Sequence, residues 1–174
     1  MKIVVINGRP RSGKDTFVQF CQIHNLWCAN ISTVDFVKEI AVYCGWNKEK
    51  TPKNRKFLSD LKDLLTNWDD VPYRKIEQRI AAYKEKMEQY GIDPEENGII
   101  FIHSREPEEI KRFCDEMGAI SLLIVRDEVT NNEQSNHADS EVFNYEYNYT
   151  IANNGTLEDL EKRAKEFLDI LSNL

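Results

Sequence analysis

A glycine-rich segment with the pattern G-x-x-x-x-G-K follows the first apolar run of the chain. It begins at Gly8, reaches Gly13 and Lys14, and continues into Asp15 and Thr16. Two glycines at this spacing allow a tight turn whose backbone N–H groups converge on a phosphate. A helix that begins at the second glycine adds its positive N-terminal end, and the lysine can reach the β- and γ-phosphates of a nucleotide. The pattern therefore predicts an ATP-binding phosphate loop (P-loop) that includes Gly8, Arg11, Ser12, Gly13, Lys14, Asp15 and Thr16.

The residue after the lysine departs from the usual form of this motif. That position normally holds Ser or Thr, whose hydroxyl binds Mg²⁺, and here it is Asp15, followed by Thr16. A carboxylate and a hydroxyl both offer the hard oxygen that Mg²⁺ prefers, so we predict Asp15 and Thr16 as metal ligands. A negative side chain is also favoured where a helix begins, and a purely structural role for Asp15 stays open.

Short β-rich runs alternate with helical periodicity, which is typical of an α/β fold with a parallel sheet. The helical pattern over 107–117 connects two of the strands, and a last helix follows Thr156, whose hydroxyl and Asp159 predict an N-cap. The predicted strands are 3–6, 27–31, 99–102, 120–125 and 147–151.

The stretch from 34 to 98 is far longer than one crossover helix requires. Its apolar residues recur at helical spacing in three groups, so it predicts a helical insertion on a single domain that spans 1–174. We expect Ser32 or Thr33 to cap the first insertion helix and Trp68 to lie on the apolar face of the second. Residues 127–146 are polar and without periodicity, and we predict a lid-like segment there.

Composition narrows the classes of protein that the chain can represent. The net charge of −7 argues against a general nucleic-acid binder, although residues 1–63 carry +5 and residues 64–174 carry −12. No apolar run approaches the length of a membrane span, and the first apolar run is too short for a signal peptide. Four cysteines show no disulfide-like framework; Cys21, His24 and Cys28 lack a fourth zinc ligand, so packing is the better interpretation. We expect a cytoplasmic protein without nucleic-acid or membrane partners.

Several segments resemble phage-type deoxynucleoside monophosphate kinases and related adenylate-kinase-like P-loop proteins. The matching segments are Arg11-Ser12-Gly13-Lys14-Asp15-Thr16, Ile124-Val125-Arg126, Ser135 to Glu141, and Ile151 to Leu160. The likeness covers both ends of the chain well and the middle loosely. It implies a five-stranded sheet of order 2-3-1-4-5, ATP and Mg²⁺ on the loop, and an acceptor phosphate under the helical insertion.

The resemblance also suggests roles for residues outside the loop. Arg126 would contact ATP or the transferring phosphoryl group, and Arg105 matches the arginine that follows the third strand. The catalytic set is then Lys14, Arg105 and Arg126. The segment that includes Asn154 would recognise adenine. Lys38 and Arg55 are candidate acceptor-phosphate contacts, with solvated helix faces as the alternative.

One position departs from the family in a way that bears on catalysis. Such kinases usually end the third strand with an acidic residue that holds magnesium, and this chain has His103 there. An imidazole cannot replace a hard carboxylate ligand for Mg²⁺. Either Asp15 and Glu106 compensate, or catalysis is weak or lost.

Two functions follow from these observations. The first is an ATP-dependent phosphotransferase that resembles nucleoside monophosphate kinases, or a kinase of another phosphorylated metabolite such as phosphomevalonate or dephospho-coenzyme A. The second is a nucleotide-binding module with weak or no kinase activity, for which His103 is the motive. The sequence leaves the identity of the acceptor and the oligomeric state open.

Overall fold

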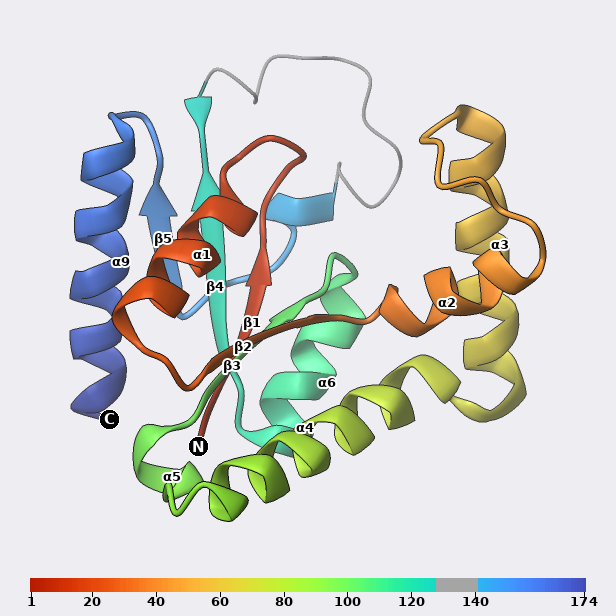
Figure 1. The fold of residues 1–174 in the computed structure, drawn as a ribbon. Coiled ribbons are helices and arrows are strands. Elements are labelled where there is room, and N and C mark those ends of the chain that lie inside the picture. The colour runs from red at the N-terminus through yellow and green to blue at the C-terminus, as the bar shows by residue number, and fades with distance from the viewer. Residues whose placement is uncertain (128–140) are drawn as a thin grey trace.

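The computed structural model describes residues 1–127 and 141–174, which form a parallel five-stranded sheet with helices on both faces (Figure 1). The strand order is β2-β3-β1-β4-β5, which confirms the expected topology. In the register of the central strands, Ile6 of β1 pairs with His103 of β3 and Leu122 of β4. The strands are β1 (Lys2–Asn7), β2 (Cys28–Ser32), β3 (Ile99–His103), β4 (Ile120–Val125) and β5 (Tyr149–Ala152).

The helices connect these parallel strands and cover both faces of the sheet. The capping box predicted for the last helix is present, because Asp159 N donates to Thr156 Oγ1 at 3.2 Å and Thr156 N donates to Asp159 Oδ2 at 2.9 Å. The helices are α1 (Lys14–His24), α2 (Asp35–Tyr43), α3 (Pro52–Asp69), α4 (Val71–Gln89), α5 (Pro94–Asn97), α6 (Pro107–Met117) and α9 (Leu157–Ser172), with a short 3-10 helix η1 (Glu141–Phe143).

Alternation along the strands divides the core into two layers. Val4 and Ile6 face α1 and α9, where Phe17 and Phe167 pack, whereas Val5 faces the other side of the sheet. That second layer is filled by α4 and α6 through residues such as Tyr73, Ile76, Ile110 and Phe113. A continuous apolar run such as 3–6 is what a strand buried on both faces requires.

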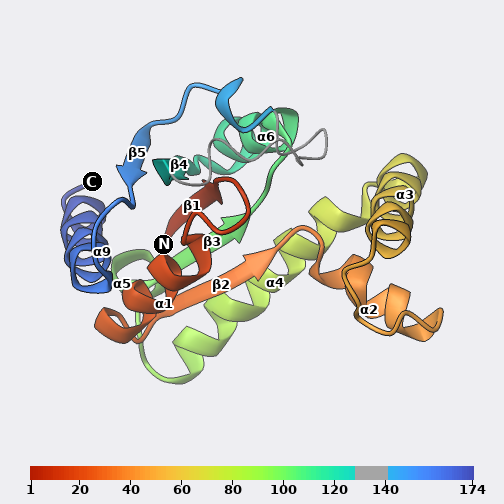
Figure 2. The ribbon, with the colours of Figure 1, turned by 90° about the horizontal axis from the view of Figure 1, so that it is seen from above.

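The predicted insertion contains α2, α3, α4 and the short α5, and α4 lies along the sheet. Helices α2 and α3 project away from the strands (Figures 1 and 2). No residue of α3 is buried, and Trp68 is 74% exposed. The expectation that Trp68 lies on a packed apolar face is therefore wrong, because α3 projects from the sheet and buries none of its residues.

The predicted cap of the first insertion helix is also wrong. The N-cap residue of α2 is Val34, and no side chain caps this helix. Ser32 instead receives a hydrogen bond from Val34 N at 3.4 Å, and Ser32 N donates to Asp35 Oδ2 at 2.9 Å. Asp35 thus closes the turn after β2 from within the helix.

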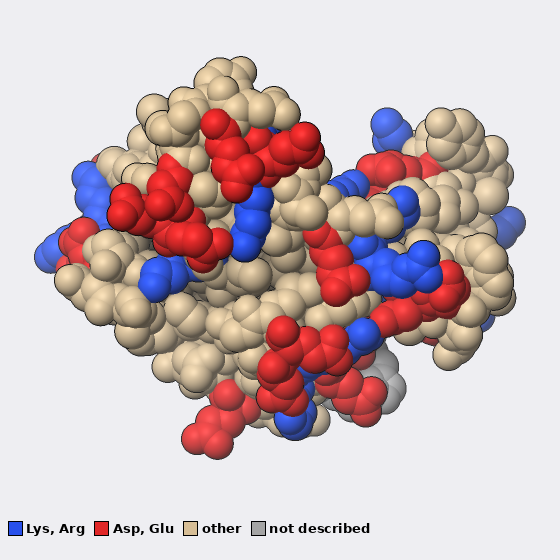
Figure 3. Space-filling model, turned by 90° about the horizontal axis from the view of Figure 1, so that it is seen from below, with Lys and Arg blue, Asp and Glu red and all other residues tan. Residues whose placement is uncertain are grey.

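The predicted lid-like segment 127–146 lies mainly outside the described residues. Of its described part, Val142 is fully buried, and its carbonyl oxygen accepts a hydrogen bond from Tyr147 Oη at 2.9 Å. Among the helices of the described ranges, none combines the length and the apolar character that a membrane span needs. Acidic and basic side chains are intermixed over the face that Figure 3 shows.

Candidate active site

The loop between β1 and α1 is a left-handed turn pressed against its neighbours. Gly8 has φ 151° and Gly13 has φ 97°, with Arg11 at φ 66° between them. A Cβ on Gly8 would lie 2.4 Å from the carbonyl oxygen of Ile124, and a Cβ on Gly13 would lie 2.3 Å from Asn153 Nδ2. Both positions therefore require glycine, for their backbone angle and for lack of space.

The loop delivers the chain directly into α1, whose N-cap residue is Gly13. No side chain caps this helix. The N–H groups of a helix's first turn need an acceptor, and together with the helix dipole they favour an anion at this place. The predicted strand–loop–helix arrangement around Gly8 and Lys14 is confirmed.

The Lys14 ammonium is held over the loop by backbone carbonyls. Its Nζ donates to the carbonyl oxygen of Gly8 at 2.7 Å and to that of Arg9 at 3.1 Å. The ammonium therefore lies on the loop beside the start of α1, where it can stabilise negative charge on a bound phosphate.

Two buried asparagines brace the loop from the sheet. Asn7 Oδ1 accepts from Gly8 N at 2.7 Å, and its Nδ2 donates to Tyr147 Oη at 2.7 Å and to the carbonyl oxygen of Arg105 at 3.3 Å. Asn153 Nδ2 donates to the carbonyl oxygen of Ser12 at 2.9 Å. Our sequence reasoning missed both bracing roles. The available signal was a polar residue that ends a buried apolar strand.

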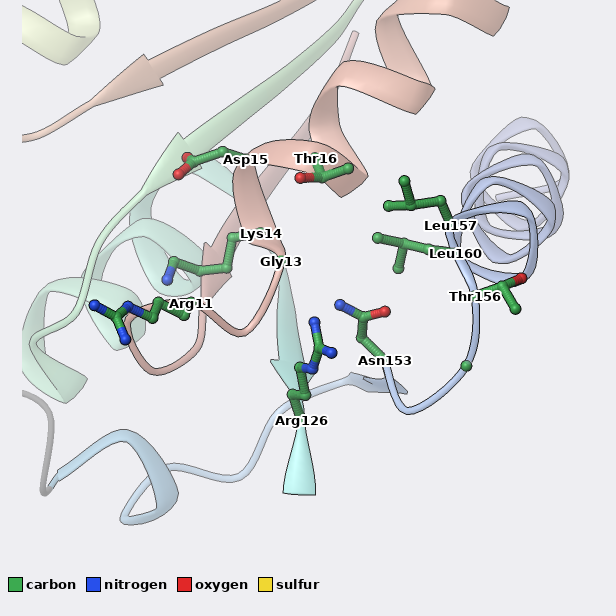
Figure 4. A pocket seen from close by; sticks show the side chains of 11 residues that line it. Arg11, Gly13, Lys14, Asp15, Thr16, Arg126, Asn153, Thr156, Leu157 and Leu160 are labelled. Carbon is green, nitrogen blue, oxygen red and sulfur yellow. The ribbon is translucent and has the colours of Figure 1, made fainter. Parts of the chain in front are cut away.

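A cavity of about 350 Å³ opens beside the loop, between α1 and α9 (Figure 4). Its polar wall includes Lys14 and the guanidinium-bearing Arg126 at the end of β4, and α9 contributes the apolar side chains of Leu157 and Leu160. The cationic side of the cavity is suited to bind phosphates, and the leucines are suited to pack against the flat base of a nucleotide. The lining residues are Arg11, Gly13, Lys14, Asp15, Thr16, Arg126, Asn153, Gly155, Thr156, Leu157 and Leu160.

Most of the predicted ATP-site residues meet at this cavity. Gly8 and Ser12 form the loop itself, and the others line the wall, with the exception of Asn154. Asn154 Nδ2 instead donates to Asp127 Oδ2 at 2.7 Å, and Asn154 Oδ1 accepts from Asp127 N at 3.0 Å. The neighbouring Asn153 is the residue of this pair that reaches the cavity.

His103 ends β3 next to the loop, as its position in the sequence predicts. Its Nδ1 lies 3.8 Å from Asp15 Oδ1, and its buried Nε2 has no hydrogen-bond partner in the part of the chain that the structure describes. Burial lowers the pKa of His103 to about 4, although the Asp15 carboxylate acts in the opposite direction. The imidazole is therefore neutral at neutral pH and supplies no oxygen to a metal.

Asp15 and Thr16 offer the oxygens that remain for Mg²⁺. The Asp15 side chain is 84% exposed, and both residues line the cavity. No group of three or more His, Cys, Asp or Glu side chains in 1–127 and 141–174 could hold a metal ion. One or two protein oxygens fit Mg²⁺ nevertheless, because this ion is commonly held by few side chains together with phosphates. Glu106 is the N-cap residue of α6 and does not line the cavity.

Arg105, predicted as a catalytic residue, is exposed just after β3 and does not line this cavity. The two residues predicted for the acceptor also lie apart from it. Arg55 is exposed in the first turn of α3. Lys38 lies on α2, with its Nζ 3.7 Å from Asp35 Oδ1, and lines a second cavity of about 420 Å³ that also contacts Trp46. The structure thus brings the ATP-side residues together and leaves the acceptor candidates distributed along the insertion.

No protein-family model matches the chain, and no curated protein sequence matches it either. Several solved structures match the chain in fold. The dephospho-CoA kinase of Campylobacter jejuni superposes with a TM-score of 0.54 at 14% identity, and the match covers 99% of this chain and 98% of that one. The chain has the fold of a P-loop kinase.

Two further kinases show weaker likeness to this P-loop kinase fold. Shikimate kinase of Aquifex aeolicus matches with a TM-score of 0.47 at 13% identity, over 97% of this chain and 96% of that one. Thymidylate kinase of Candida albicans matches with a TM-score of 0.44 at 11% identity, over 99% of this chain and 92% of that one. Sequence identities this low show a common fold and nothing about the acceptor. The identity of the acceptor has to be inferred from the site.

Proposed function

We propose that the protein is an ATP-dependent phosphotransferase that moves the γ-phosphoryl group of ATP to a small phosphorylated acceptor. The observation that supports this proposal most directly is the Lys14 ammonium, which is held over the loop by two carbonyl oxygens beside the uncapped start of α1. A nucleoside monophosphate is the favoured acceptor, because the motifs around Lys14, Arg126 and 151–160 resemble those of phage-type deoxynucleoside monophosphate kinases.

In this proposal catalysis consists of positioning and charge neutralisation. The loop N–H groups and Lys14 bind the β- and γ-phosphates, and Arg126 lies across the cavity to contact the triphosphate. Asp15 and Thr16 would hold Mg²⁺, which neutralises charge on the phosphate oxygens when bound. The γ-phosphoryl group passes in line to the acceptor, and no covalent enzyme intermediate is needed.

The acceptor would approach from the side of β2 and β3, because the ATP cavity is bounded by β4, β5 and α9 on the other side. The insertion 34–98 lies on this approach, which is why we assign acceptor specificity to it. Arg105 at the carboxyl edge of β3 lies where open α/β sheets bind ligands, and Lys38 and Arg55 remain proposed acceptor contacts.

His103 motivates a second candidate function, a nucleotide-binding module without turnover. A neutral imidazole at the end of β3 leaves Asp15 as the nearest carboxylate for the metal. If Asp15 does not compensate, ATP would bind without being used.

A panel of acceptors separates the two functions. The protein is incubated with Mg-ATP and each of the common ribo- and deoxyribonucleoside monophosphates, phosphomevalonate and dephospho-coenzyme A, and ADP release and product mass are recorded. A product heavier by one phosphoryl group with one acceptor class supports the kinase. Saturable ATP binding with no product from any acceptor supports the binding module.

A further inference from the structure

Helix α3 contains one lysine that is nearly withdrawn from solvent. Lys62 Nζ lies 2.8 Å from Glu109 Oε1 of α6, and only 15% of the Lys62 side chain and 24% of the Glu109 side chain is exposed. No residue of α3 is fully buried, and Lys62 is half-buried. A helix that leaves Trp68 and Leu64 in solvent therefore directs an ammonium group toward the body of the protein.

The partner of this ammonium, Glu109 of α6, is hydrogen-bonded to the residue that follows β3. Glu109 Oε2 accepts a hydrogen bond from Ser104 Oγ at 2.7 Å, and Ser104 is buried directly between His103 and Arg105. The backbone of Arg105 is in turn bonded to Asn7, which holds the first N–H of the P-loop. Lys62 thus ends a short chain of contacts that begins at the phosphate-binding loop.

Stability alone is a weak reason to place a lysine here. An ion pair that leaves water loses hydration that its attraction only partly restores, and an apolar side chain of similar size commonly serves as well. The same helix also contains a pair of the ordinary kind, Lys56 with Asp60, at 74% and 58% exposure. Lys62 differs from Lys56 in burial and in its position next to the strand edge.

The position of the Lys62 ammonium relative to the ATP cavity indicates which ligand it could bind. The cavity proposed for ATP is lined by Lys14 and the start of α1, so a γ-phosphoryl group bound by Lys14 would lie at the loop, where β1 and β3 end. Lys62 comes from the insertion and is linked through Glu109 to Ser104, the residue that follows β3. An anion that receives the phosphoryl group in line would lie between the loop and Lys62.

We propose that Lys62 binds the phosphate of the acceptor and that Glu109 is its exchangeable counter-ion, replaced when the acceptor enters. This assignment rests on the proposed kinase function and adds a specific residue to it. It adds a phosphate contact seven residues along α3 from Arg55, a distance of about 10.5 Å at the helical rise, at the position where α3 meets Glu109 of α6.

Equilibrium binding tests the assignment without turnover. AMP, GMP, CMP and dTMP are titrated by calorimetry into the full chain with saturating Mg-ADP. In Lys62→Gln we expect the Kd of the tightest of these ligands to rise at least tenfold, whereas the Kd of ADP changes less than twofold. Lys56→Gln removes a lysine from the same helix and should change neither value more than twofold. Wild-type protein that binds none of the four ligands would overturn the assignment.

A second variant distinguishes a phosphate-binding role of Lys62 from a purely structural one. Glu109→Gln removes the counter-ion but keeps the ammonium, so monophosphate binding should be kept or become tighter if Lys62 is the ligand. Equal weakening in Lys62→Gln and Glu109→Gln would mean that the pair acts only by holding α3, and would overturn the proposal. Phosphoryl transfer is measured separately, so that the inference and the kinase function can fail independently. If the wild-type protein transfers phosphoryl groups and the acceptor Kd is unchanged in Lys62→Gln, the inference is refuted and the kinase function stands. Binding that depends on Lys62 without transfer refutes the function instead.

Discussion

At the scale of single residues, the site combines one fixed cation with an unusual pair. Lys14 is held by the carbonyl oxygens of Gly8 and Arg9 in the ligand-free protein. His103 replaces the acidic residue expected at the end of β3 and lies 3.8 Å from Asp15. Because the imidazole is neutral, Asp15 is the carboxylate on which magnesium binding would depend.

The substitution Asp15→Asn tests this dependence. We expect the magnesium concentration required for half-maximal phosphoryl transfer to rise at least tenfold, because an amide is a weaker ligand than a carboxylate. The free energy of unfolding should stay within about 1 kcal/mol of the parent, the scale of a helix-end charge. Magnesium titrations of activity and urea unfolding measure the two quantities.

Glu158→Gln is the matched control, since Glu158 occupies the first turn of α9 and has the same favourable position relative to a helix dipole. It should leave the magnesium titration unchanged. An Asp15→Asn titration that coincides with the parent curve would mean that Asp15 serves only the start of α1, and the metal ligands would have to be other residues.

At the scale of elements, the P-loop depends on side chains from the strand before it and from a turn far away in the sequence. The turn between β5 and α9 reaches it through Asn153, whose Nδ2 donates to Ser12 O, and β1 reaches it through Asn7. The same Asn153 amide fills the space that a side chain on Gly13 would need. Loop shape is therefore a joint property of β1, β4 and the β5–α9 turn.

The variant Asn153→Ala should loosen this arrangement. Loss of the buried hydrogen bond leaves the Ser12 carbonyl without that donor, which costs roughly 1–3 kcal/mol of unfolding free energy. We also expect the Kd of ATP to rise about tenfold, because the loop N–H groups are no longer held in register. Chemical unfolding and calorimetric titration with ATP check both effects.

Asn154→Ala provides the comparison for stability, since Asn154 is exposed and bonds to Asp127. It should lower the unfolding free energy less than Asn153→Ala does. The reverse order would show that the turn is held by the Asp127 pair rather than by the loop contact.

Much of this architecture could be predicted from the sequence because local signals agreed. The buried run 3–6, the glycine spacing from Gly8 to Gly13 and the capping box at Thr156 each specify an element by short-range chemistry, and all three are present. The order of the strands came from family resemblance. Trp68 and the cap of α2 were predicted wrongly, since both depend on which elements pack together.

The Asn153 brace and the Lys62–Glu109 pair could not be predicted for the same reason. The residues of both contacts lie far apart in the sequence: Asn153 and Ser12 are 141 positions apart, and Lys62 of α3 meets Glu109 of α6. A single sequence shows that these side chains are polar. It does not show that the fold brings them to the edge where β1 and β3 end.

At the scale of the whole molecule, the fold separates two sides of one sheet edge. The cavity that we propose for ATP lies toward β4, β5 and α9, and the helical insertion lies toward β2 and β3. The buried groups near the boundary, His103 among them, are shielded from water, and this shielding makes the stability of the protein depend on pH.

The predicted dependence has a definite sign and window. Burial lowers the pKa of His103 from 6.5 to about 4, so between these values the unfolded chain binds a proton that the folded chain does not. Stability from this residue is present above pH 6.5 and is lost as the pH falls toward 4. Between pH 6.5 and 4.5 we expect urea unfolding of the ligand-free protein to show a loss of about 2 kcal/mol that is absent in His103→Gln.

The comparison with His103→Gln separates the histidine from the carboxylates. Hydrogen bonds to the N-terminal ammonium and to Lys84 lower the pKa of Glu95 to about 2, so the stability from this residue is lost as the pH falls through about 4.5 toward 2, equally in the parent and in His103→Gln. Parallel pH profiles for the parent and His103→Gln would contradict the assigned burial of the imidazole.

The central claim is that Lys14 and its loop transfer the γ-phosphoryl group of ATP to a phosphorylated acceptor. The most direct measurement follows label from [γ-³²P]ATP into acceptor products in the presence of Mg²⁺, for the parent and for Lys14→Ala. We predict labelled diphosphate product from the parent and a rate at least roughly a hundredfold lower from Lys14→Ala, with the thermal unfolding transition preserved. Label that remains in ATP with every acceptor tested, or equal transfer by a folded Lys14→Ala, would contradict the account.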